Sequence, residues 1–140
     1  MRKVKDIMTD QVVTVSPKDN IYEVAVKMKN NDTGFIPVVE NGDRLIGVIT
    51  DRDLVIRAIA EKHPGSTAVE TVMTRGIRCA SPDTPVDEAA DMMAEQQIRR
   101  LPVTEGERLI GIVSLGDMAV RNNFADEAGD ALSDISHQVH

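Results

Sequence analysis

The sequence has no tryptophan and very few aromatic residues, with one tyrosine and two phenylalanines among 140 residues. It has a single cysteine, Cys79, so no disulfide can form within the chain and a reducing compartment is expected. No apolar run is long enough to cross a bilayer, and the basic start of the chain is not followed by the apolar core of a signal peptide. These absences predict a cytoplasmic protein with no membrane partner.

Positive charge is also scarce, because 16 Lys and Arg residues face 23 Asp and Glu residues, for a formal net charge of −7. An acidic chain lacks the basic surface that nonspecific nucleic-acid binding needs, so no nucleic-acid partner is expected. The three histidines, His63, His137 and His140, do not have zinc-ligand spacing, and no metal site is predicted. No nucleophile–base pair and no phosphate loop with a lysine is visible. The sequence therefore predicts no enzyme activity and no catalytic cofactor.

What the sequence does contain is an internal duplication. Residues such as Val4, Met8 and Pro37 recur 65 positions later, and after the loss of one turn residue Asp53 recurs 64 positions later as Asp117. A unit this short buries little apolar surface and needs a neighbour to complete its core. We expect a pseudo-twofold pair of repeats with a ligand-binding cleft along the seam between them. The predicted segments are a first repeat at 1–62, a linker at 63–68, a second repeat at 69–120 and a partly helical C-terminal tail at 121–140.

Each repeat is predicted to be strand, helix, strand, strand, helix. In the first copy, the β-branched residues at 12–15 predict a short strand that stops at a proline turn. A helix follows, because apolar residues fall at i, i+3, i+4 and i+7 from Ile21 to Met28. Two apolar runs at 35–39 and 45–49 are joined by Asn41-Gly42, a strong hairpin signal, and a second helix begins after Thr50. The expected fold class is α+β, with short sheets flanked by helices.

The end of each repeat carries one motif, a glycine, two aliphatic residues, a hydroxyl residue, two variable residues and an aspartate. The two copies are Gly47–Asp53 and Gly111–Asp117. Glycine lets a backbone or a flat ligand come close, and the aspartate can accept two hydrogen bonds from a vicinal diol, as the acidic residue of dinucleotide folds does with ribose. A second interpretation stays open, because the same spacing forms a capping box that needs no ligand.

Several motifs together resemble a known family. They are Asp6-Ile7-Met8-Thr9, Val15-Ser16-Pro17, Ile36-Pro37-Val38-Val39, Thr50-Asp51-Arg52-Asp53-Leu54 and Arg99-Arg100-Leu101-Pro102-Val103. The chain resembles a tandem pair of CBS domains (a Bateman module) of the small stand-alone bacterial type over about residues 4–118. The resemblance implies two βαββα CBS repeats packed with pseudo-twofold symmetry. It also implies a cleft for an adenosine-containing ligand such as AMP, ADP, ATP or S-adenosylmethionine.

The resemblance also implies which residues would bind that ligand. Those assigned to ribose are Asp53 and Asp117, with Thr50 and Ser114 beside them. Those assigned to one adenine slot are Thr14, Val15, Ser16, Ile36, Pro37 and Val38. Those assigned to the other slot are Cys79, Ala80, Ser81, Leu101, Pro102 and Val103. With so few aromatic residues, such a slot must be mostly aliphatic, with backbone amides reading the base edge.

The two copies differ just before their repeated proline, where the second has Arg99 and Arg100. A guanidinium pair suits phosphate, so we expect unequal sites with a phosphate tail reaching one of these arginines. Arginines that merely balance nearby glutamates are an equal alternative.

The resulting functional hypothesis is a regulatory module that senses an adenosine-containing ligand and signals to a separate effector protein. The alternative is a structural or interaction dimer whose clefts are vestigial. The helix after Thr50 is apolar on more than one face, with Val55, Ile56 and Ile59 in addition to its core residues. Because CBS pairs dimerise through such helices, the resemblance implies a homodimer.

Overall fold

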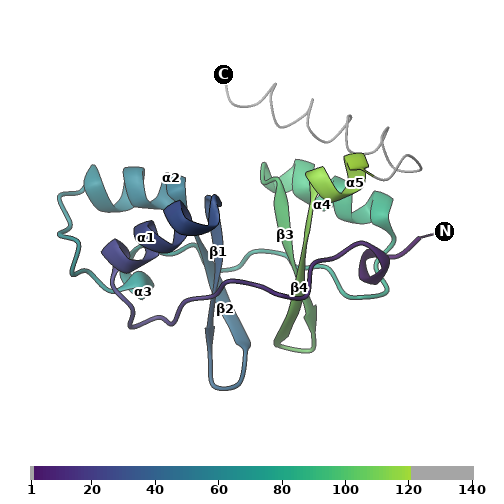
Figure 1. Ribbon diagram of the computed structural model, residues 1–140, viewed down its shortest axis with the longest axis horizontal. Coiled ribbons are helices and arrows are strands. Elements are labelled where there is room, and N and C mark those ends of the chain that lie inside the picture. Colours follow the sequence, from purple (N-terminus) through teal and green to yellow (C-terminus); the bar gives the residue numbers. More distant parts are fainter. Residues whose placement is uncertain (1, 121–140) are drawn as a thin grey trace. The chain divides into compact units, whose positions relative to one another are not determined.

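The computed structural model describes residues 2–120 (Figure 1). The predicted C-terminal tail, 121–140, lies outside the described residues. The chain divides into two compact units, one formed by Val13–Ile77 and the other by Met1–Val12 together with Arg78–His140. The start of the first repeat therefore packs with the body of the second repeat. The packed units and the sequence repeats have different boundaries.

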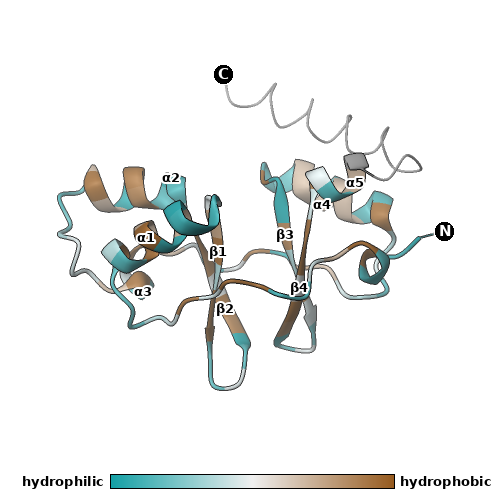
Figure 2. Ribbon diagram, viewed as in Figure 1, coloured by the Kyte–Doolittle hydropathy of each residue, from teal (hydrophilic) through white to brown (hydrophobic). Residues whose placement is uncertain are grey.

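The unit Val13–Ile77 combines one antiparallel hairpin with several helices. Its elements are α1 (Ile21–Asn31), β1 (Phe35–Glu40), β2 (Arg44–Thr50), α2 (Asp51–Asp53), the π-helix η2 (Leu54–Ile59) and α3 (Val69–Val72). Its core consists of Val15, Ile21, Val24, Met28, Ile36, Val38, Ile49, Ala58, Val69, Val72 and Met73. Figure 2 shows that β1 and β2 are hydrophobic and that the turn joining them is hydrophilic.

The other unit has the same plan. Its elements are η1 (Val4–Asp6), α4 (Val86–Gln96), β3 (Arg100–Glu105), β4 (Arg108–Ser114) and α5 (Leu115–Val120). Its core consists of Val4, Ile7, Ala80, Val86, Ala89, Ala90, Met92, Met93, Leu101, Val103, Val113, Leu115 and Met118. Together with the first unit, this arrangement confirms the predicted α+β fold.

The predicted helix that begins at Ile21 is α1. The Asn20 side chain accepts a hydrogen bond from the Glu23 backbone N–H at 2.8 Å, which satisfies one of the free donors of the first turn. The helix ends at Asp32, whose φ of 48° is left-handed. Ile21, Val24 and Met28 are buried, as their spacing predicts, whereas Ala25 of the same predicted face is exposed.

The hairpin turns explain the residue that is lost between the two copies. In the first hairpin Glu40 pairs with Arg44, and the three turn residues Asn41, Gly42 and Asp43 all have positive φ. In the second, Glu105 pairs with Arg108, and the turn has only two residues. The predicted hairpin at Asn41-Gly42 is confirmed, and both hairpins carry a register shift at the same repeat position.

The strand predicted at 12–15 is reduced to one residue. Val15 forms a parallel bridge with Val38, through its N–H to the Pro37 carbonyl at 3.1 Å and its carbonyl to the Val39 N–H at 2.9 Å. Ala80 repeats this bridge with Val103. Proline has no N–H to donate on this side of β1, so the pairing cannot be extended into a regular ladder.

The first residues of the chain are held by the second repeat's hairpin. Thr9 and Ile112 exchange backbone hydrogen bonds of 2.8 and 2.9 Å. In the other unit Thr74 and Val48 exchange bonds of 2.8 and 2.9 Å in the same way. Each repeat thus supplies the short lead-in segment that pairs with the other repeat's last strand.

None of the helices within residues 2–120 has the length and hydrophobicity that a transmembrane span requires.

Candidate functional site

The β2–α2 junction places the first motif aspartate in a capping box. The Thr50 hydroxyl accepts from the Asp53 N–H at 3.1 Å, and the Asp53 carboxylate accepts from the Thr50 N–H at 3.1 Å. These reciprocal bonds satisfy two donors at the start of the helix. Asp53 is only 6% exposed, and it is the one buried charged side chain among the described residues.

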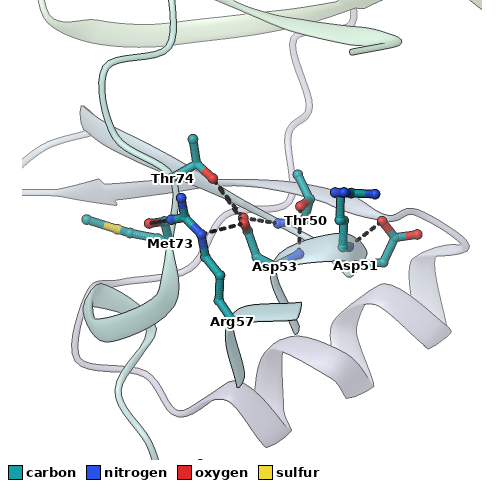
Figure 3. Close-up of polar contacts among 7 residues, drawn as sticks. Thr50, Asp51, Asp53, Arg57, Met73 and Thr74 are labelled. Atoms are coloured by element: carbon teal, nitrogen blue, oxygen red, sulfur yellow. Dashed lines mark hydrogen bonds and ion pairs between the residues drawn. The ribbon is translucent and has the colours of Figure 1, made fainter. Parts of the chain in front are cut away.

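Two side chains from outside the motif also bind this carboxylate (Figure 3). The Thr74 hydroxyl lies 3.0 Å from Asp53 Oδ1 and 3.1 Å from Oδ2. Arg57 Nε lies 3.8 Å from Asp53 Oδ1, and its Nη1 donates to the Met73 carbonyl at 3.0 Å. The Asp53 charge is thereby compensated inside the unit, as a buried charge must be.

The motif glycine makes room for protein backbone. A Cβ on Gly47 would lie 2.6 Å from the Thr74 carbonyl oxygen and 3.4 Å from the Met73 sulfur. Of the two roles that the sequence allows for this glycine, the structure thus supports close approach of a neighbouring backbone.

The β4–α5 junction repeats this geometry with fewer contacts. The Ser114 hydroxyl accepts from the Asp117 N–H at 3.0 Å, and Asp117 Oδ2 accepts from the Ser114 N–H at 3.1 Å. A Cβ on Gly111 would lie 2.8 Å from the Met8 sulfur and 2.9 Å from the Thr9 carbonyl oxygen. Asp117 is half-buried. The capping-box interpretation therefore holds at both junctions, and it accounts for one oxygen of each carboxylate.

Within each unit the predicted slot residues lie on adjoining segments, but many of their side chains face the core. Val15, Ile36 and Val38 are core residues of one unit, and Ala80, Leu101 and Val103 are core residues of the other. The less buried slot residues are Thr14, Ser16, Cys79 and Ser81, whereas Pro37 and Pro102 are buried.

The arginine pair adjoins the second junction. Arg99 is exposed, and its carbonyl accepts from the Leu115 N–H at 3.0 Å, which fixes the start of α5 beside it. Arg100 is half-buried and begins β3. In the first unit Gly34 replaces Arg99, and a Cβ there would lie 2.5 Å from the Asp51 carboxylate. The two junctions therefore differ in charge as well as in contacts.

Cys79, a predicted slot residue, is the one cysteine of the chain. It is half-buried, and burial raises the pKa of its thiol, so the unreactive protonated form is favoured. Within residues 2–120, His, Cys, Asp and Glu side chains do not gather in threes as a metal site requires.

Sequence reasoning missed Thr74 and Arg57 as partners of Asp53. Both left a signal, since Met73-Thr74 repeats Met8-Thr9 and Arg57 lies four residues after Asp53, the spacing of a helical ion pair. What the sequence could not indicate is that Thr74 returns to the first repeat's last strand.

Comparison with known proteins identifies the family. The model of the CBS domain matches residues 4–59 and 69–121, and the chain belongs to this family as a tandem pair. CBS-pair proteins are regulatory modules. The CBS domain-containing protein YhcV of Bacillus subtilis is 46% identical, over 99% of this chain and 98% of the relative.

Two solved structures share the fold. The crystal structure of Hypoxic Response Protein I with two coordinated zinc ions has a TM-score of 0.79 and 30% identity, covering 86% of this chain and 98% of that one. The CBS domain pair of protein MJ0100, in complex with 5′-methylthioadenosine and S-adenosyl-L-methionine, has a TM-score of 0.76 and 30% identity, covering 85% of this chain and 98% of that one.

Proposed function

We propose that this CBS pair is a regulatory module that binds an adenosine-containing ligand and signals to a separate effector protein. The ligand class is AMP, ADP, ATP or S-adenosylmethionine, and the chain itself catalyses no reaction. A CBS pair of the same fold binds two adenosine-containing compounds, S-adenosylmethionine and methylthioadenosine, which supports this ligand class.

The observation that carries the proposal is the repeated hydroxyl–aspartate pair at the strand–helix junction. At both junctions the carboxylate is fixed by a backbone N–H donor and stands next to a hydroxyl side chain. A carboxylate held in this way is preorganised to accept two hydrogen bonds from a ribose diol. Asp53 and Asp117 are the candidates for that role, with Thr50 and Ser114 beside them.

The base would lie against the short parallel bridge of a unit. In the first unit that slot is formed by Thr14, Val15, Ser16, Ile36, Pro37 and Val38. In the second it is formed by Cys79, Ala80, Ser81, Leu101, Pro102 and Val103. Arg99 and Arg100 border the second junction and would hold a phosphate tail, which favours a nucleotide over a nucleoside there.

A thermal-shift screen tests the proposal. Ligand at about a hundred times its Kd adds about 2.7 kcal/mol to the free energy of unfolding. AMP, ADP, ATP, S-adenosylmethionine and adenosine should therefore include at least one compound that raises the melting temperature by several degrees. GMP serves as a control for the base. No shift with any adenosine compound at millimolar concentration would reject the proposal, and mass spectrometry of ligand released by heat would identify a bound compound directly.

The second candidate is a structural or interaction dimer. Its supporting observation is the apolar surface of η2, where Val55 is 54%, Ile56 49% and Ile59 70% exposed. Figure 2 shows this helix as a hydrophobic segment. If the chain dimerises and no adenosine compound binds, this candidate replaces the first.

A further inference from the structure

We infer that the two repeated aspartates have different roles: Asp53 is a structural clamp that holds the lead-in segment at Thr74, and Asp117 alone is the carboxylate that binds the ligand's diol. The second half of this inference rests on the proposed function. The first half concerns the folded chain only and can be tested without a ligand.

The two carboxylates differ in the number of hydrogen-bond donors that they already have. A carboxylate offers about four lone-pair sites on two oxygens. Both oxygens of Asp53 are within 3.1 Å of the Thr74 hydroxyl, and Oδ2 also accepts the Thr50 N–H. Across the described residues Asp117 accepts one hydrogen bond, from the Ser114 N–H to Oδ2. Asp117 Oδ1 thus has no donor among the described residues, whereas each oxygen of Asp53 already lies beside one.

Asp53 is also the more deeply buried of the two carboxylates. Asp53 is 6% exposed and has Arg57 Nε at 3.8 Å, whereas Asp117 is half-buried. Among the hydrogen bonds within residues 2–120, none ends on Asp117 Oδ1, so a diol that binds there displaces no hydrogen-bond donor of this part of the chain.

Thr9 shows that the clamp is specific to one copy. Thr9 occupies the repeat position of Thr74 and forms the same backbone bonds, to Ile112 in place of Val48. Among the hydrogen bonds of the described residues, that of the Thr74 hydroxyl to Asp53 has no counterpart between Thr9 and Asp117. The repeat position of Arg57 is Arg121, which lies outside the described residues.

Thermal unfolding tests the clamp, with the two threonines as a matched pair. Thr74→Val removes a bond to a charged group and should lower the melting temperature by roughly 3–8 °C, whereas Thr9→Val should change it by less than about 1 °C. Thr74→Ser should restore most of the loss. In the background of Asp53→Asn, Thr74→Val should cost clearly less, because the two side chains are coupled. Equal losses at Thr74 and Thr9, or additive losses in the double variant, would overturn the clamp.

Calorimetric titration with AMP and 2′-deoxy-AMP, well below the melting temperature, tests the diol. The wild-type chain should prefer AMP. Asp117→Asn keeps an oxygen for the Ser114 N–H and should weaken AMP binding about 10- to 100-fold, with loss of the preference over 2′-deoxy-AMP. If Asp53 acts only as the clamp, Asp53→Asn should keep the preference for AMP over 2′-deoxy-AMP, whatever its effect on overall affinity.

The outcomes separate this inference from the proposed function. If the preference for AMP is lost in Asp53→Asn and kept in Asp117→Asn, the assignment is wrong although the chain is a nucleotide sensor. If neither AMP nor any other adenosine compound binds the wild type, the proposed function fails and Asp117 loses its role. The clamp is then still decided by the unfolding of the threonine variants.

Discussion

Gly47 and Thr74 are in closer contact than any larger residue at position 47 would allow, because a Cβ there would lie 2.6 Å from the Thr74 carbonyl oxygen. The same segment donates the Thr74 hydroxyl to Asp53 and exchanges backbone bonds with Val48. In the first unit the motif glycine and the motif aspartate thus both contact residues 73–74 at the end of β2.

Gly47→Ala should therefore lower the free energy of unfolding by about 1–3 kcal/mol. The added methyl group meets the Thr74 carbonyl oxygen, which is held in place by its hydrogen bond from the Val48 N–H. Urea unfolding followed by circular dichroism measures the loss. Gly116→Ala is the control, since among the described residues its Cβ would meet only the Ser114 hydroxyl, at 3.5 Å, and helix propensity favours alanine there. Equal midpoints for Gly47→Ala and the wild type would contradict this packing role.

Asn20→Ala should lower the free energy of unfolding by about 1 kcal/mol, because the first turn of α1 loses its side-chain cap on Glu23. Asn30→Ala, at an exposed position inside the same helix, should be neutral or slightly stabilising because alanine has the higher helix propensity. Chemical denaturation of both variants checks this, and a greater loss at Asn30 would show that capping is not what fixes the start of α1.

Cys79 should react slowly with iodoacetamide at pH 7 in the folded chain, because burial raises the pKa of its thiol. The alkylation rate should rise with pH about a midpoint above that of the same thiol in urea, which serves as the reference. The raised pKa also makes the free energy of unfolding depend on pH. The stabilisation from keeping the thiol neutral is fully present below the unfolded-state pKa, and it is lost as the pH rises towards the folded-state pKa. A native midpoint below the urea midpoint would refute the assignment of a passive half-buried thiol.

Self-association should depend on η2. Replacing Ile56 and Ile59 together by lysine places charge on its exposed apolar surface and should convert the proposed homodimer into a monomer, as measured by light scattering at micromolar concentration. Val26→Lys, on α1 at a site that is 37% exposed, should leave the mass unchanged. A monomeric wild-type chain would exclude the homodimer.

Arg100→Ala should weaken AMP binding about tenfold or more and leave adenosine binding unchanged, because only AMP carries a phosphate for the guanidinium to bind. Arg108→Ala, an exposed arginine at the start of β4, is the matched control for lost positive charge. Titration calorimetry of both variants with AMP and with adenosine separates loss of a phosphate contact from loss of positive charge. Equal losses for AMP and adenosine would reject the phosphate role.

The elements that depend on local sequence could be predicted well. Helix α1 follows from its apolar spacing, and the first hairpin follows from Asn41-Gly42 between two apolar runs. The strand expected at 12–15 could not be judged locally, since its pairing with β1 is limited by Pro37, a residue distant in sequence. The π-helical form of η2 was also not predictable, because it is a small departure from the α-helix that the same periodicity predicts.

The residues of the candidate site could be predicted from the sequence, but the residues that contact them could not. The duplicated motif identified Thr50, Asp53, Ser114 and Asp117 as a capping box or a diol site, and the hydrogen bonds of both capping boxes are present. That Ile36, Val38, Leu101 and Val103 point into the cores was decided by the faces of the hairpins. Strand alternation is visible in sequence, but which face meets the core depends on what packs there.

The sequence by itself determined the duplication, the α+β plan of each copy and the family to which the chain belongs, because these depend on residue types and spacings that recur within short segments. Only the tertiary structure decided that each lead-in segment pairs with the other repeat's last strand, and that Thr74 reaches Asp53 while Thr9 has no such bond to Asp117. The physical reason is that hydrogen bonds between segments distant in the chain depend on chain path and side-chain orientation. Two copies of one motif can therefore acquire different surroundings.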